Sequence, residues 1–132
     1  MHPNPEVSAK VHGRFGAHPR VNVTPPLPYA AFVRAMGEAD FIMSDSGGVQ
    51  EESTYLGIPC LTLRENTERP ITVEQGTNAL VGRDRQAILD GADQILAGRG
   101  KRGRVPENWD GHAAERIAAD LWHWLHTLPS SS

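Results

Sequence analysis

The 132-residue sequence has one cysteine, few aromatic residues and no long apolar run, and these scarcities exclude several classes of protein. With Cys60 alone, the chain can form no internal disulfide and no cysteine metal cluster, which favours a reducing compartment. No stretch reaches the ~20 apolar residues of a membrane-spanning helix, and the N-terminus carries no signal-peptide pattern. We therefore expect a soluble, cytoplasmic protein with Cys60 in its core.

The chain also lacks an excess of basic charge. Thirteen basic and sixteen acidic side chains give a net charge of −3, without a long basic run. This balance argues against a nucleic acid or a membrane surface as the main partner, so any anion must be bound locally. The hydrophobic content of 39% is sufficient for the core of one ordinary domain.

Short apolar runs alternate with helical patterns along the chain. The runs at 21–24, 41–44, 59–63 and 79–82 predict strands. Helical spacing predicts helices at 29–36, from about 48 to 56, and around Ile88, Ala92 and Ile95, with a last helix, started by Asp110 or Gly111, that carries Ile117, Leu121, Trp124 and Leu128 on one face. Segments 64–78 and 98–111 are predicted to be irregular, and 129–132 to be a frayed tail. This order predicts an α/β fold, a Rossmann-like parallel sheet flanked by helices.

The loop DSGG, residues 45–48, lies between a predicted strand and a predicted helix. In an open α/β sheet, ligands bind beyond the carboxyl ends of the strands, where helix N-termini present free N–H groups. Gly47 and Gly48 would let a phosphate approach those groups closely, and the Ser46 hydroxyl can donate a further bond. A simple helix cap is the alternative, but a cap needs only Ser46 or Asp45.

Two adjacent glutamates follow the glycines. Glu52 lies three residues after apolar Val49, so we expect it to face inward, where a carboxylate can accept both hydroxyls of a ribose. Glu51 is expected on the solvated face. The alternative for Glu52 is an internal ion pair with Arg64 or Arg69.

The irregular segment 64–78 follows a predicted core strand, which is where α/β proteins place binding loops. Its cations, Arg64 and Arg69, suit a diphosphate because the guanidinium group can form two parallel hydrogen bonds. Glutamates of the same segment, Glu65, Glu68 and Glu74, are candidates to position these arginines by ion pairing. The alternative is that both arginines are solvated surface charges.

The block from DSGGVQEE to NALVG, residues 45–82, together with WDGHAAERI near the end, resembles the C-terminal domain of non-hydrolysing UDP-N-acetylglucosamine 2-epimerases. The resemblance covers nearly the whole chain, and residues 1–132 are expected to form a single domain. It implies the C-terminal half of a GT-B fold, in which the active site lies between two Rossmann-like domains. It also implies that this chain is one partial nucleotide-binding domain, without the N-terminal catalytic domain.

The resemblance assigns roles to residues that match the family's motifs. Ser46, Gly47 and Gly48 surround the diphosphate, Glu52 binds the ribose, and Arg69 lies beside the nucleotide. Phe32 matches the aromatic residue that flanks the uracil, although its spacing equally fits a core helix residue. His2 matches a histidine that belongs to a regulatory UDP-sugar site in some members.

The reaction implied by the resemblance interconverts UDP-GlcNAc and UDP-ManNAc, a step of polysaccharide biosynthesis. UDP is eliminated to give 2-acetamidoglucal and is then added back with the C2 proton on the other face. No metal or redox cofactor is implied, and the intact enzyme is expected to be a homodimer. The acid–base carboxylates of the family lie in the N-terminal domain, so no catalytic residue is expected in this chain, which needs that domain in cis or in trans.

Two other functions fit parts of the sequence. A GT-B glycosyltransferase would also bind a nucleotide diphosphate at a helix N-terminus, but its chemistry does not require the RENTERP block at 64–70. A non-catalytic UDP-sugar-binding or regulatory module would fit a chain that lacks the catalytic carboxylates.

Overall fold

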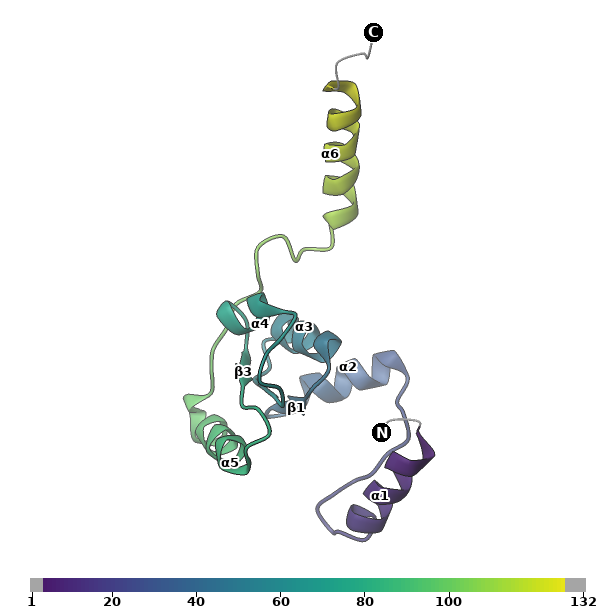
Figure 1. Ribbon diagram of the computed structural model, residues 1–132, viewed down its shortest axis with the longest axis vertical. Helices are drawn as coiled ribbons and strands as arrows, with labels where there is room; N and C mark the ends of the chain where they lie inside the picture. The colour runs from purple at the N-terminus through teal and green to yellow at the C-terminus, as the bar shows by residue number, and fades with distance from the viewer. Residues whose placement is uncertain (1–3, 128–132) are drawn as a thin grey trace. The chain divides into compact units, whose positions relative to one another are not determined.

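The structure is a computed structural model that describes residues 4–127. The chain divides into two units, Met1–Glu38 and Ala39–Ser132. Each unit is described by itself, and Figure 1 labels most of their helices and strands. The tail expected at 129–132 lies outside the described residues.

The first unit contains two helices. Helix α1, Pro5–Phe15, was not predicted, although Asn4 and Pro5 form a typical helix start. The Asn4 side chain accepts a hydrogen bond from the Glu6 N–H at 2.9 Å, and Pro5 occupies a position where a missing N–H is harmless. Helix α2, Tyr29–Gly37, begins after Pro28 and confirms the predicted helix in that region.

The strand predicted at 21–24 is wrong. These residues are irregular, and the part of this unit that the structure describes contains no strand. A β-prone run needs a neighbouring strand to satisfy its backbone hydrogen bonds. Pro25 and Pro26 follow directly and offer no N–H for such pairing.

The second unit is built on a three-stranded parallel sheet in the order β1-β2-β3. The strands are β1, Ile42–Ser44, β2, Cys60–Thr62, and β3, Asn78–Leu80. Their register aligns Ile42 with Cys60, and Cys60 with Asn78. The predicted strands at 41–44, 59–63 and 79–82 are thus confirmed, with small differences at their ends.

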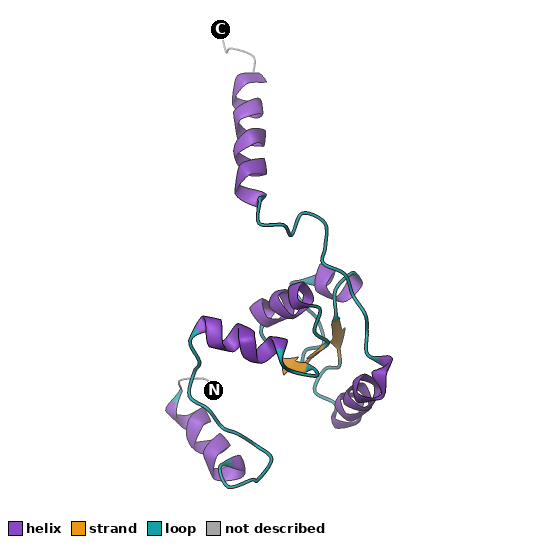
Figure 2. Ribbon diagram, turned by 180° about the vertical axis from the view of Figure 1, so that it is seen from behind, coloured by secondary structure: helices purple, strands orange, loops and turns teal. Residues whose placement is uncertain are grey.

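Helices cover both faces of this sheet (Figures 1 and 2). Helix α3, Gly47–Leu56, packs on the face to which Asn78 points, since the Asn78 side chain is bonded to its backbone. Helix α5, Arg85–Gln94, packs on the opposite face, where Leu61 contacts the Gly91 position. Because side chains of a strand alternate between faces, residues 60–62 pack against the helices on both faces of the sheet. The molecule therefore has the predicted α/β architecture.

The connection after α5 is more structured than expected. A short π-helical turn, η1, Ile95–Arg99, continues α5 and contains Gly98 at φ 73°. Beyond it, the Lys101 ammonium donates to the carbonyl oxygens of Val73 and Asn78, and burial lowers the pKa of this lysine. The Arg104 N–H donates to the Gln75 carbonyl oxygen at 2.8 Å. This part of the connection is therefore held against residues 73–78, which lead into β3.

Helix α6, Ala113–Thr127, has no buried residue. It begins at Ala113, two to three residues after the start predicted at Asp110 or Gly111. The Asp110 carboxylate accepts the His112 N–H at 3.0 Å and two bonds from the Arg116 guanidinium at 2.8 and 2.9 Å, which tie the segment before the helix to its first turn. These bonds hold the pKa of the Asp110 carboxyl well below its usual range. Among residues 4–127, no helix is long and apolar enough to span a bilayer.

Candidate functional site

The N-terminus of α3 follows the carboxyl end of β1, as the sequence predicted. Ser46 occupies the N-cap position with extended backbone angles, φ −80° and ψ 130°, but its side chain makes no capping bond. Its N–H donates to the Ser44 hydroxyl at 3.1 Å. Within residues 4–127, the Ser46 hydroxyl has no hydrogen-bond partner. The capping role that we considered as the alternative is thus not performed by this side chain.

Gly47 and Gly48 are not required by the fold of this unit. Neither has a positive φ, which is the backbone conformation that favours glycine. A Cβ atom added at either position would meet no atom within 4 Å. At the other end of α3, by contrast, Gly57 has φ 74° and closes the helix in the left-handed conformation. The two glycines at the N-terminus leave an open approach to the first N–H groups of the helix, which also carry the positive end of its dipole.

Arg69 lies beside α3, but its ion-pair partner is Glu51 and none of the glutamates that were predicted for it, which were Glu52, Glu65, Glu68 and Glu74. The Arg69 Nε atom lies 2.8 Å from Glu51 Oε1, and both side chains are about half exposed, at 46% and 41%. An ion pair with this exposure contributes about 0–1 kcal/mol to stability, so its main effect is on the orientation of the guanidinium. Glu51 is thus a partly exposed residue, and the ion pair that it forms with Arg69 was not predicted.

Glu52 takes part in none of the ion pairs described for residues 4–127. Its side chain also has no hydrogen-bond partner within that range, and the residue is partly buried. The internal ion pair that we considered for it is therefore not formed. Arg64 instead pairs with Glu68, with Nη2 and Oε1 3.1 Å apart, one of the pairings expected within this segment.

The interior next to this helix is polar rather than apolar. The buried polar side chains come from α3, the strands and the following loops: Gln50, Ser53, Thr54, Thr62, Thr72, Thr77 and Asn78. Buried polar groups require hydrogen-bond partners, and within residues 4–127 only the Thr77 hydroxyl lacks one. The Asn78 amide is bonded on both sides, since it donates to the Gln50 carbonyl oxygen at 3.0 Å and accepts from the Thr62 hydroxyl at 3.1 Å.

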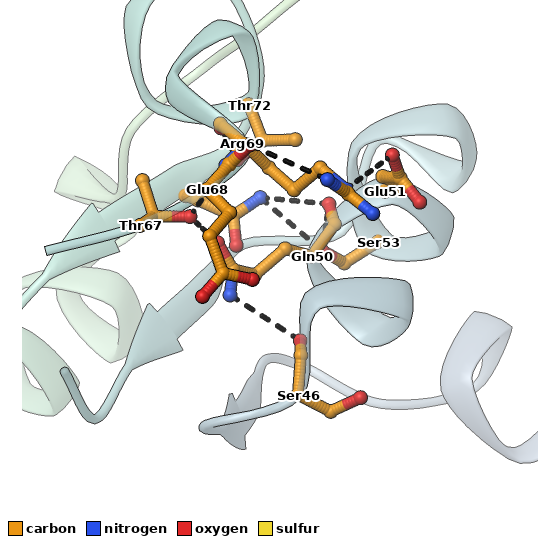
Figure 3. A network of polar contacts seen from close by, with 9 residues as sticks. Ser46, Gln50, Glu51, Ser53, Thr67, Glu68, Arg69 and Thr72 are labelled. Atoms are coloured by element: carbon orange, nitrogen blue, oxygen red, sulfur yellow. Dashed lines mark hydrogen bonds and ion pairs between the residues drawn. The ribbon is translucent and has the colours of Figure 1, made fainter.

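Figure 3 shows how part of this polar interior joins α3 to the segment that carries Arg69. The Gln50 side chain donates to the Ser46 carbonyl oxygen at 3.3 Å and accepts from the Thr67 hydroxyl at 2.6 Å. The Thr67 hydroxyl in turn accepts the Arg69 N–H at 2.9 Å. Sequence reasoning missed Gln50 and Thr67. The polar residues Gln50, Ser53 and Thr54, at helical spacing i, i+3 and i+4, were the available signal.

The segment predicted to be irregular, 64–78, is not irregular throughout. It contains the short helix α4, Pro70–Glu74, for which Arg69 is the N-cap residue and Pro70 takes the first position. Proline is favoured at that position because its fixed φ suits a helix start. Pro70 was therefore the signal in the sequence that could have predicted this helix.

The remaining candidates lie elsewhere. Phe32 is on α2 in the first unit and is partly buried. His2 lies outside the described residues. Cys60 is buried on β2, and burial raises the pKa of its thiol, although hydrogen bonds with Ser53 and Thr62 act in the opposite direction. The thiol is therefore a core group, as the sequence predicted.

Comparison with known proteins gives a consistent result along the chain. A family model described as UDP-N-acetylglucosamine 2-epimerase matches residues 1–121. The UDP-N-acetylglucosamine 2-epimerase of Bacillus subtilis is 39% identical over 125 residues, which are 92% of this chain and 33% of that protein. The protein of the same name from Escherichia coli K12 is 38% identical over 126 residues, with the same two shares, 92% and 33%. The chain thus spans about a third of the length of these curated relatives.

Solved structures agree with the sequence matches. The S. aureus MnaA-UDP co-structure superposes with a TM-score of 0.80 at 31% identity, covering 100% of this chain and 37% of that one. The UDP-GlcNAc 2-epimerase from Neisseria meningitidis bound to UDP-GlcNAc gives a TM-score of 0.78 at 33% identity, covering 92% and 34%. The predicted fold class, an α/β Rossmann-like parallel sheet, is confirmed.

Proposed function

The chain belongs to the UDP-N-acetylglucosamine 2-epimerase family, and on this basis we propose that its second unit binds the diphosphate of UDP or a UDP-N-acetylhexosamine at the N-terminus of α3. The observation that carries the proposal is the pair Gly47 and Gly48, which neither backbone conformation nor packing explains. A ligand that needs close approach to the helix N–H groups does explain them. Both of the solved structures described above contain UDP or UDP-GlcNAc.

The roles of the site residues follow from their chemistry. The Ser46 hydroxyl and the N–H groups of Gly47 and Gly48 would donate to the diphosphate, and Arg69 would add a positive charge. Glu52, which has no side-chain partner within residues 4–127, would accept the ribose hydroxyls. The roles of two further residues rest on the family resemblance alone: Phe32 would flank the uracil, and His2 would belong to a regulatory UDP-sugar site. These roles require no metal ion.

We further propose that the intact protein interconverts UDP-GlcNAc and UDP-ManNAc by elimination and re-addition of UDP. This reaction develops negative charge on the departing diphosphate, which a helix N-terminus and an arginine can stabilise. The acid–base groups at C2 would come from a separate N-terminal domain, in cis or in trans, with this chain as the C-terminal nucleotide-binding domain. The cytoplasm, where Cys60 stays reduced, is the proposed compartment, and a homodimer is the proposed assembly. Family membership favours this function over that of a glycosyltransferase fragment.

Calorimetric titration of the 132-residue chain with UDP tests the binding proposal. Ser46→Ala and Arg69→Ala should each weaken binding, by about 1–3 kcal/mol for the charged contact. Arg64→Ala is the matched comparison, because Arg64 belongs to the same segment and, like Arg69, is paired with a glutamate, but the proposal gives it no contact with the diphosphate. It should lose less affinity than Arg69→Ala. Unchanged affinity in Ser46→Ala and Arg69→Ala would remove the diphosphate from this helix.

A further inference from the structure

Gln50 is a fully buried side chain between the two elements of the proposed site. It is 0% exposed and lies on the second turn of α3. Its Nε2 atom donates to the carbonyl oxygen of Ser46, the N-cap residue, at 3.3 Å. The other end of the amide must therefore accept, and its Oε1 atom accepts from the Thr67 hydroxyl at 2.6 Å. The orientation of the Gln50 amide is thus set by its partners.

Thr67 continues the chain of bonds to Arg69. A threonine hydroxyl has one proton, which Thr67 donates to Gln50, so its lone pairs are left to accept the Arg69 N–H at 2.9 Å. The Arg69 carbonyl oxygen accepts from the Thr72 hydroxyl at 2.7 Å. Both backbone groups of Arg69 are therefore fixed by side chains, at a residue whose backbone angles, φ −124° and ψ 59°, belong to neither a regular helix nor a strand.

The guanidinium of Arg69 is held by the same helix. Glu51 follows Gln50 in the chain, and its Oε1 atom lies 2.8 Å from Arg69 Nε. Helix α3 thus holds Arg69 at two points, at its backbone through Gln50 and Thr67 and at its side chain through Glu51 (Figure 3).

We propose that Gln50 and Thr67 are positioning residues, which fix Arg69 relative to the N-terminal turn of α3 so that both elements can bind one diphosphate. This inference rests on the proposed function of the site. Neither residue would touch the nucleotide, because Gln50 is fully buried and Thr67 acts through the Arg69 backbone. Their contribution is preorganisation, which reduces the conformational freedom that Arg69 loses on binding.

The polar interior also supplies a control for a purely structural role. The Thr62 hydroxyl, on β2, donates to the amide oxygen of Asn78, on β3, at 3.1 Å. Asn78 in turn donates to the backbone carbonyl oxygen of Gln50 at 3.0 Å, so this bond supports α3 without involving the Gln50 side chain, Thr67 or Arg69. Thr62→Val and Thr67→Val each remove one hydroxyl and leave one side-chain amide oxygen without its donor. Both substitutions should lower the melting temperature, but only Thr67→Val should release Arg69 from its fixed position beside α3.

Two measurements on the 132-residue chain test the proposal. In UDP titrations, Thr67→Val should weaken binding about tenfold, as expected for lost hydrogen bonds that position a charged group, whereas Thr62→Val should stay within about twofold. Thr67→Ser, which keeps the hydroxyl, should restore most of the affinity. In the Arg69→Ala background, Thr67→Val should cause no further loss. The proposal would be overturned if the increases in Kd caused by Thr67→Val and Arg69→Ala multiplied in the double variant. It would also be overturned if Thr62→Val lost as much affinity for UDP as Thr67→Val.

The second measurement needs no ligand and separates this proposal from the function on which it rests. The NMR signal of the Arg69 Nε–H should be distinct and protected in the wild type, Thr67→Ser and Thr62→Val. It should lose its protection in Thr67→Val and Gln50→Met. If the wild type fails to bind UDP, the proposed function is wrong, and this signal still decides whether Thr67 fixes Arg69. An unchanged signal in Thr67→Val would refute the positioning role.

Discussion

Substitution of Gly48 by alanine should raise the stability of the chain and lower its affinity for UDP. Gly48 is in the first turn of α3, its φ is not positive, and an added Cβ would meet no atom within 4 Å. Alanine is favoured over glycine in a helix by about 0.5–1 kcal/mol, and by less near its end. Gly48→Ala should therefore raise the free energy of unfolding by a few tenths to about 1 kcal/mol.

The same Cβ would stand where the proposed diphosphate approaches the helix N–H groups. Loss of one hydrogen bond to a charged group amounts to about 1.5–3 kcal/mol, which is roughly a ten- to hundredfold increase in the Kd for UDP. Urea denaturation would measure the first effect, and calorimetric titration the second.

Gly57→Ala is the matched control because it changes the other end of the same helix. Gly57 also has open space around it, but its φ of 74° is strained for alanine. We expect a loss of about 1–2 kcal/mol in stability and little change in UDP affinity per folded molecule. If Gly48→Ala were more stable and bound UDP as well as the wild type, the glycine argument for a ligand at this helix would be refuted.

Three further predictions concern the ribose contact, the start of α6 and catalysis. Glu52→Gln should lose affinity for uridine in a titration but keep its affinity for pyrophosphate, and equal losses would mean that Glu52 acts only through the fold. Because the pKa of Asp110 is depressed below its ordinary value of 3.8 in the folded state, its stabilisation of α6 should be present above that pH and should decrease as the pH falls below it. Circular dichroism should record this loss of helix, and Asp110→Asn should remove the dependence. Finally, the 132-residue chain by itself should show no epimerisation of UDP-GlcNAc and no deuterium incorporation at C2 in heavy water, because general acid–base groups contribute about 10²–10⁴-fold and none is proposed here. Epimerisation at the rate of an intact enzyme would show that a base within this chain was overlooked.

Local patterns in the sequence were sufficient to predict most of the second unit. The apolar runs that became β1 and β2 and the stop of α3 at Gly57 depend on neighbours within a few residues. The predicted strand at 21–24 failed because strand formation depends on a partner elsewhere in the chain, which local composition does not reveal.

The contacts around α3 were harder to predict for the same reason. Helical spacing indicated that Glu51 and Glu52 point in different directions, but it could not show which of them Arg69 would meet. That contact depends on how the chain returns beside α3 after β2. The burial of Gln50 likewise depends on Thr67 and Asn78, which lie 17 and 28 residues away in the sequence.

The most direct test of the account is a titration of the isotope-labelled chain with UDP, followed by NMR at each backbone amide. The account predicts saturable shifts at the N–H groups of Gly47, Gly48 and Val49, together with the Arg69 Nε–H, all with one Kd. Addition of pyrophosphate should shift the same helix amides. Saturable shifts centred elsewhere, for example on the basic residues Lys101 and Arg102, with the amides of Gly47 and Gly48 unchanged, would contradict the placement of the diphosphate at this helix.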